Sequence, residues 1–160
     1  MGFRFTDLFN RKDKDGEAVR PQPDRVNRRF DEHFPRLFAY LRTCVGGEIP
    51  AQDMAVKAFS QAFTQTAEST GDDEFRTVLY RAARRMCRPA LRNNKPQDDS
   101  LTTREREIIS LVFDAGLSRG QIAYMFHFRE STISSLLMSG LRKLKEETSP
   151  AMTAAYMNVA

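Results

Sequence analysis

Apolar residues recur at steps of three and four through much of the chain. The first such stretch starts at Val26 and forms one stripe: Phe30, Phe34, Leu37, Phe38, Leu41 and Val45. This spacing is the one that an amphipathic helix needs, because residues three and four apart share a helix face. Sustained alternation, the pattern of a half-buried strand, is nearly absent. The sequence therefore predicts an all-α protein.

Prolines and glycines divide this part of the chain into three expected helices. Pro35 should break or restart the first helix, and the stretch "VGGE" should end it. Pro50 suits the first turn of a second helix, and Pro89 should bend or end a third. The inward residues expected on the second and third helices are Ala55, Phe59, Ala62, Phe63 and Thr66, then Phe75, Leu79, Ala82, Ala83, Met86 and Ala90.

Two capping boxes mark the later part of the chain. Thr102 with Glu105 predicts one helix start, and Ser118 with Gln121 predicts another. Gly116 should end the first of these helices. Apolar faces are expected at Ile108, Ile109, Val112 and Phe113, at Ile122, Ala123 and Phe126, and, after the turn "HFRE", at Ile133, Leu136, Leu137, Leu141 and Leu144. This order is typical of a helix-turn-helix, although a plain helical hairpin without DNA affinity has the same pattern.

The chain of 160 residues is long enough for two small helical domains, the second a helix-turn-helix. We expect a disordered tail over 1–25, a helical domain over 26–92, a polar linker over 93–100, the helix-turn-helix over 101–147 and a C-terminal tail over 148–160. Pro150 is expected to act as the helix breaker before that last tail. Because the linker is short, the two domains should pack against each other.

The residue content excludes several function classes. No catalytic, nucleotide-binding or metal-ligand motif occurs, so we expect neither an enzyme nor a cofactor nor a metal site. Cys44 and Cys87 are far apart in sequence and suit reduced packing residues, with a disulfide or metal site as the alternative. No apolar run approaches about 18 residues, and no signal-peptide core is seen at the N-terminus. These features predict a cytoplasmic protein without a membrane span.

Five arginines lie along one face of the expected third helix: Arg81, Arg84, Arg85, Arg88 and Arg92. We call this set the arginine stripe. No acidic residue interrupts it, and like charges at these spacings repel one another. A solvated face usually alternates signs. The stripe therefore favours an anionic partner, either nucleic acid or an acidic protein surface, over a solvated face.

The last predicted helix should carry the DNA-reading face, yet it has no charged residue between Ser131 and Leu141. Candidate nucleic-acid contacts on and beside this helix are Arg129, Ser131, Thr132, Ser134, Ser135 and Arg142. Serine hydroxyls can touch phosphates or bases, but they lack the bidentate geometry of Arg, Asn and Gln. Met138 on the same face suits an apolar protein groove instead. The pattern predicts weak sequence preference.

Two long stretches resemble a known family. "LFAYLRTCVGGEIPAQDMAVKAFSQAF" and "FRTVLYRAARRMCRPALR" resemble the promoter-melting domain of bacterial RNA polymerase sigma factors of the extracytoplasmic-function type. The segment from Leu101 to Lys145 resembles their second domain, which docks on the polymerase and reads the upstream promoter element. The resemblance covers roughly residues 28–145 and implies two partners, RNA polymerase core and promoter DNA. "LTTREREII" is also similar to LuxR-type regulators, but the N-terminal half is not.

The resemblance leaves two mechanisms open. In the first, the protein directs RNA polymerase to promoters, with Asp53, Val56, Lys57 and Met138 as polymerase or regulator contacts. In the second, it is a sigma mimic that binds an anti-sigma factor or another regulator without reading DNA. Val56 and Lys57 replace acidic and amide residues of the family, which favours the mimic. Eight linker residues also reach at most about 28 Å, against roughly 50 Å between promoter elements.

Overall fold

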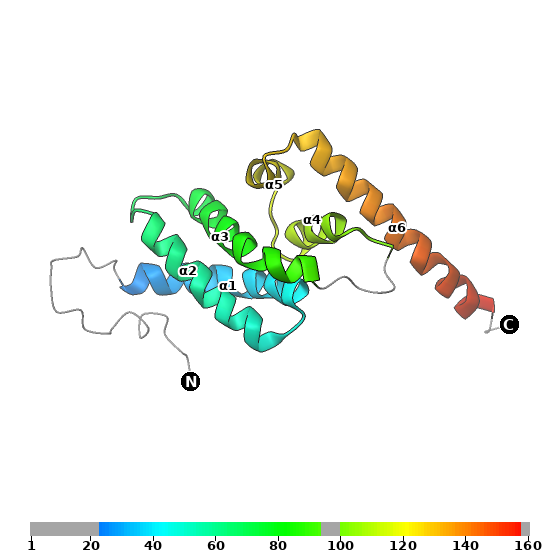
Figure 1. Ribbon diagram of the computed structural model, residues 1–160, viewed down its shortest axis with the longest axis horizontal. Helices are drawn as coiled ribbons and strands as arrows, with labels where there is room; N and C mark the ends of the chain where they lie inside the picture. The colour runs from blue at the N-terminus through cyan, green and yellow to red at the C-terminus, as the bar shows by residue number, and fades with distance from the viewer. Residues whose placement is uncertain (1–22, 94–99, 158–160) are drawn as a thin grey trace.

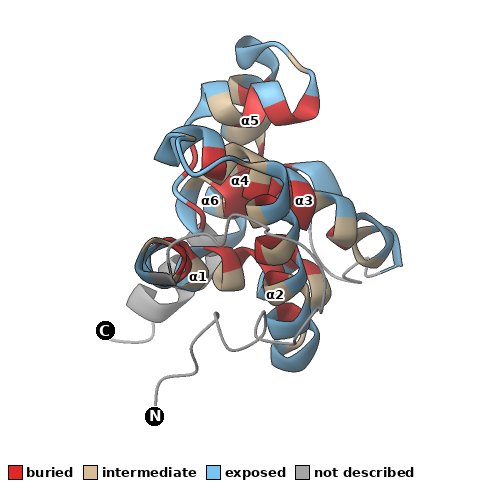
Figure 2. Cartoon of the chain, turned by 90° about the vertical axis from the view of Figure 1, so that its left-hand side faces the viewer, coloured by how far each residue is buried: buried red, intermediate tan, exposed pale blue. Residues whose placement is uncertain are grey.

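The computed structural model describes residues 23–93 and 100–157, and within these residues it contains helices and no strand (Figure 1). The helices are α1 (Pro23–Val45), α2 (Glu48–Gln65), α3 (Asp72–Asn93), α4 (Thr103–Phe113), α5 (Arg119–Phe126) and α6 (Glu130–Met157). The predicted all-α class is therefore confirmed. Figure 2 shows that the buried residues gather on the sides of the helices that face one another.

Helices α1, α2 and α3 pack together as an N-terminal unit around a core of aromatic rings. The ring of Phe59 lies 4.7 Å from that of Phe30, and the ring of Phe63 lies 5.0 Å from that of Phe75. Phe59 and Phe75 are fully buried. Besides Phe59 and Phe63, α2 contributes small, fully buried side chains to this core, Ala51, Ala55, Ala58 and Ala62. Small residues let the neighbouring helices approach α2 closely.

Three prolines that were expected to interrupt helices do not end them. Pro35 lies inside α1, Pro89 lies inside α3, and α6 continues through Pro150 to Met157. A proline removes one backbone hydrogen bond from a helix. The carbonyl left without a donor in α1 belongs to Asp31, and in α3 it belongs to Arg85; both residues are exposed, so water can hydrogen-bond these groups.

Helices α4, α5 and α6 form the C-terminal unit, and its predicted turns are present. Both capping boxes form, at Thr102 with Glu105 and at Ser118 with Gln121. Gly116 follows α4 with a φ of 70°, the left-handed conformation that glycine adopts without steric cost. His127 caps the end of α5 in the same region, with a φ of 55°. The helix-turn-helix order that the sequence predicts is therefore confirmed.

The buried face of α4 differs from the predicted one. Phe113, expected inside, is 63% exposed, whereas Leu111 is fully buried. Glu105 and Glu107 are also buried. The reason is that α4 contacts α6 and also α1 of the other unit, so two sides of a short helix are covered. A single apolar stripe in the sequence cannot reveal the second contact.

The two units touch through α1 with α4 and through α3 with α5. This contact agrees with the packing expected from a short linker, most of which (94–99) lies outside the described residues. The expected domain limits stay predictions, and most of the N-terminal tail lies outside the described range. The structure places residues 23–25 and 148–157, assigned above to the two tails, in α1 and α6.

Candidate nucleic-acid interface and the contact between the units

A buried carboxylate joins three helices where the two units meet. The Tyr40 hydroxyl on α1 donates a hydrogen bond to Oε1 of Glu107 on α4, at 3.1 Å. The Nε–H of Arg84 on α3 donates to the same oxygen at 2.9 Å. The Glu107 side chain is 5% exposed and that of Arg84 is 16% exposed. A buried charge needs such partners, because an unpaired one carries a large desolvation cost.

Burial sets the ionisation state of the tyrosine in this contact. Tyr40 is fully buried, and burial, with the nearby Glu107 carboxylate second, raises the pKa of its phenol well above the usual value. The hydroxyl therefore stays protonated and remains a hydrogen-bond donor. Gly116 adds a second contact between the units, since the guanidinium of Arg36 from α1 lies against its backbone. Hydrogen bonds and guanidinium groups are therefore part of the contact between the units.

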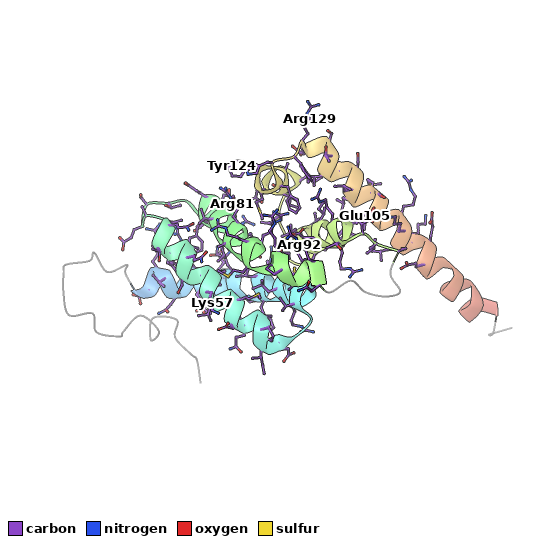
Figure 3. The ribbon with its side chains drawn as sticks, in the orientation of Figure 1. Lys57, Arg81, Arg92, Glu105, Tyr124 and Arg129 are labelled. Carbon is purple, nitrogen blue, oxygen red and sulfur yellow. The ribbon has the colours of Figure 1, made fainter. Side chains whose placement is uncertain are left out.

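The arginine stripe faces the helix-turn-helix unit over part of its length. The Arg84 guanidinium lies 3.8 Å from the ring centre of Phe126, and that of Arg81 lies 5.6 Å from the ring centre of Tyr124. Figure 3 shows Arg81 beside Tyr124, where α3 approaches α5, and Arg92 near the other end of α3. Arg85, Arg88 and Arg92 are exposed. The stripe thus combines residues used between the units with residues open to a ligand.

The predicted reading face of α6 is mostly exposed but partly engaged with the protein itself. Arg129, the residue before α6, points away from the rest of the molecule (Figure 3). Ser131, Thr132, Ser135 and Arg142 are exposed, and Ser134 is half-buried. The Ser134 hydroxyl accepts a hydrogen bond from Arg119 at 3.1 Å, and the Ser135 hydroxyl donates to the Ser131 carbonyl at 3.0 Å. These bonds compete with any contact of the hydroxyls to DNA.

A second buried carboxylate fixes α6 to α4. Glu105 accepts hydrogen bonds from Ser139 at 2.7 Å and from Lys143 at 2.9 Å, besides the backbone N–H of Thr102 in the capping box. Burial raises the pKa of Glu105, but the bonds from Lys143, Thr102 and Ser139 outweigh it and lower the pKa to about 2. Gly140 permits the close approach, because a Cβ there would lie 2.8 Å from Cδ1 of Ile109.

The predicted polymerase or regulator contacts fall on different units. Asp53 and Lys57 are exposed on α2 and form an ion pair with each other at 2.8 Å, while Val56 is half-buried. In Figure 3, Lys57 lies on α2, away from α5 and α6. Met138 is 59% exposed on α6 of the other unit. The structure therefore does not gather these residues into one patch.

The sequence did not predict which residues join the two units. These residues include Tyr40, Glu107, Tyr124 and Phe126. Tyr40 lies three residues after Leu37 on the apolar stripe, so its burial was readable from the spacing. Glu107 precedes Leu111 by one helical turn, and this spacing indicates that Glu107 shares the inward face of Leu111. The pairing of Glu107 with Arg84 had no local signal, since it joins residues 23 positions apart.

The C-terminal unit matches a known protein family. Residues 99–146 match the family Sigma-70, region 4. The match covers α4, α5 and the part of α6 that packs on them, under a third of the 160 residues. No curated protein matches the chain. The C-terminal unit is therefore similar to a helix-turn-helix domain of transcription proteins, which supports a DNA-binding role in transcription.

The described residues contain neither a cluster of metal ligands nor a membrane-spanning helix. No group of His, Cys, Asp and Glu among them could hold a metal ion. Of the helices in residues 23–93 and 100–157, none is both long and apolar enough to cross a membrane.

Proposed function

We propose that the protein acts in transcription initiation as a sigma-factor-like protein of the extracytoplasmic-function type, in the cytoplasm. In this proposal the C-terminal unit contacts promoter DNA and the N-terminal unit contacts RNA polymerase core. The observation that carries it is the match of residues 99–146 to region 4 of sigma-70 factors, on a unit whose two capping boxes both form. The sequence resemblance over residues 28–145 supports the role of the N-terminal unit.

The charges around α6 support contact with the phosphate backbone. Arg129 and Arg142 are exposed on either side of an uncharged face, and Arg119 lies close by on α5. Cations at the edges of a reading helix hold phosphates and so set its position on the duplex. The face between them has only hydroxyls and Met138, so we expect modest discrimination between sequences.

The packing of the two units limits how much of the arginine stripe a nucleic acid could reach. Arg84 lies against Phe126 of α5 and is mostly covered, whereas Arg81 lies beside Tyr124 and stays exposed. A nucleic acid strand that used the whole stripe would require the units to separate and the bonds to Glu107 to break. We propose that the packed arrangement is the resting form and that polymerase binding opens it.

The test is a binding experiment with the full chain. RNA polymerase core is expected to be retained by the immobilised protein, and the complex is expected to bind promoter duplexes selected from a random pool. Arg129→Ala with Arg142→Ala should weaken DNA binding and reduce its dependence on salt, because two phosphate contacts are lost. The matched control is Arg28→Ala with Arg42→Ala, exposed positions on α1. Failure to retain core, or equal loss in the control, would overturn the proposal.

A second candidate is the sigma mimic, which binds an anti-sigma factor or a similar regulator and does not read DNA. Two observations favour it: the internal hydrogen bonds of Ser134 and Ser135, and the exposure of Met138 on an uncharged face. It predicts that the immobilised protein retains a small regulator instead of core, and that Met138→Glu abolishes this retention. Recovery of a sharp DNA consensus with the polymerase complex would exclude the mimic.

A further inference from the structure

A cavity of about 350 Å³ lies between the two units, next to the Glu107 contact. Arg81, Arg84, Arg85 and Arg88 of the stripe line one side of it. Arg104 from α4 and His127 from the turn after α5 line the other side. Five guanidinium groups from two separate units therefore surround one small volume. Arg92, the last residue of the stripe, is not among the lining residues.

Most of the positive charges of this cavity have no acidic partner among the residues that line it. No aspartate or glutamate is among its lining residues. Glu107 is the acidic partner of Arg84, and its carboxylate is buried in the contact between the units. Within the described part of the chain, Arg85 and Arg88 form no ion pair. Gathering like charges costs free energy, so an arrangement like this one favours a ligand with several negative charges.

Two of the arginines are held in place before any ligand arrives. Arg84 is fixed by its bond to Glu107 and by the Phe126 ring beneath it. The Arg104 guanidinium lies 4.8 Å from the ring centre of Phe128. Stacking on an aromatic ring restricts the guanidinium plane, so less side-chain freedom is lost on binding. Ordered cations on both sides of a cavity are the arrangement expected for recognition rather than for solubility.

We propose that this cavity binds a small molecule carrying adjacent phosphate groups, such as a linear oligophosphate or the oligophosphate part of a nucleotide. Guanidinium groups bind phosphate oxygens in a bidentate geometry, which favours phosphate over a simple point charge. Arg81 to Arg88 rise about 10 Å along α3, so successive arginines face successive anionic groups. The volume lies at the small end of the usual range for ligand pockets, which suits a small molecule better than a duplex.

Binding there has a consequence for the whole molecule. The ligand would touch α3 on one side and α4 and the turn after α5 on the other, so it would bind only when the units are packed. A ligand that binds one state alone stabilises that state by mass action. The oligophosphate would therefore hold the units together, whatever the role of the protein in transcription.

The test uses the full chain and inorganic tripolyphosphate. Calorimetric titration is expected to show saturable binding, and thermal unfolding is expected to move to higher temperature as tripolyphosphate is added. Arg85→Ala with Arg88→Ala should weaken binding at least about tenfold, since two charge-assisted contacts are lost together. Both residues are exposed, so the circular dichroism spectrum should be unchanged. Arg92→Ala with Arg129→Ala removes the same charge outside the cavity and should leave affinity nearly unchanged.

Several results would overturn the proposal. Equal weakening in the control double variant would mean diffuse attraction to a basic surface. Citrate binding as tightly as tripolyphosphate would mean a site for polyacids without phosphate selectivity. Displacement of tripolyphosphate by a lower concentration of single-stranded DNA, with the same dependence on Arg85 and Arg88, would assign the cavity to nucleic acid. Absence of saturable binding would remove the site altogether.

Discussion

The two units of this protein are stabilised in different ways although both consist of three helices. The N-terminal unit relies on aromatic rings of α1, α2 and α3 that contact one another, together with buried alanines of α2. The C-terminal unit has shorter first helices around an apolar core that includes Ile108, Leu111 and Ile122. Polar groups add to this core: two capping boxes form, and Glu105 bonds with Ser139 and Lys143. The stabilisation from apolar burial does not depend on protonation, whereas the stabilisation from a hydrogen-bonded carboxylate does.

This difference predicts which changes should destabilise each unit. Loss of one ring leaves a void in a close-packed interior, so the N-terminal unit should be sensitive to core truncation. The C-terminal unit should be sensitive to loss of caps and to acid.

Phe59→Ala should have the largest effect. Phe59 is fully buried between Phe30 and Phe63, and a buried Phe→Ala change costs about 3–5 kcal/mol. Urea unfolding should show this loss of unfolding free energy. Phe113→Ala is the matched control in the other unit, where the ring is 63% exposed, and it should change stability little. Similar losses in the two variants would contradict the contrast between the units.

Glu107→Gln tests the contact between the units. The change keeps the shape of the side chain and removes the charge that Arg84 and Tyr40 bind, so we expect a loss of about 1.5–3 kcal/mol. Small-angle scattering should show a larger radius of gyration if the units separate. Glu146→Gln, an exposed change on α6, is the control. A variant that stays compact and equally stable would show that Glu107 does not hold the units together.

Glu105 should make the C-terminal unit sensitive to acid. Its pKa in the folded protein is about 2, below the usual 4.5, so the folded state favours the ionised form. The resulting stabilisation is fully present above pH 4.5 and is lost as the pH falls toward 2. Glu105→Gln should lower stability at pH 6 by about 1.5 kcal/mol and reduce the dependence on pH between 4.5 and 2. An unchanged pH profile in the variant would contradict this role.

Thr102→Ala should have the smallest effect, about 1 kcal/mol, because it removes the side-chain oxygen that caps α4. Ser118→Ala removes the equivalent oxygen from α5 and should cost a similar amount. Thr103→Ala, one residue further on and exposed, is the control. Thermal unfolding followed by circular dichroism measures all three. A neutral Thr102→Ala would mean that the Glu105 bonds alone fix the start of α4.

Much of the fold was predictable, because it depends on local patterns. Both capping boxes, the glycine after α4 and the helical spacing of the phenylalanines lie within a few residues of the structure they specify. The prediction from the prolines was wrong, because the sequence alone does not show that Asp31 and Arg85, the residues one turn before Pro35 and Pro89, are exposed. The exposure of Phe113 was also missed, because it depends on how α4 lies between α1 and α6.

The candidate site was predictable as a list of arginines but not as an arrangement. The spacing of Arg81 to Arg92 defines one face of α3, and that much follows from helix geometry. Which of these side chains meet Tyr124 and Phe126 depends on a contact between units that no local pattern encodes. The division of the stripe into cavity-lining residues and Arg92 likewise comes only from the three-dimensional structure.

The shared acceptor at Glu107 has a consequence for how this sequence can change over generations. One oxygen atom serves donors from α1 and α3, at Tyr40 and Arg84. A substitution at position 107 therefore leaves the buried Tyr40 hydroxyl and the half-buried Arg84 guanidinium without their acceptor. A substitution at 40 or 84 removes a hydrogen-bond donor from the buried carboxylate. Single changes at these positions should be poorly tolerated, while compensated ones should survive. Among related sequences the three positions are expected to vary together, as an inherited set rather than as independent residues.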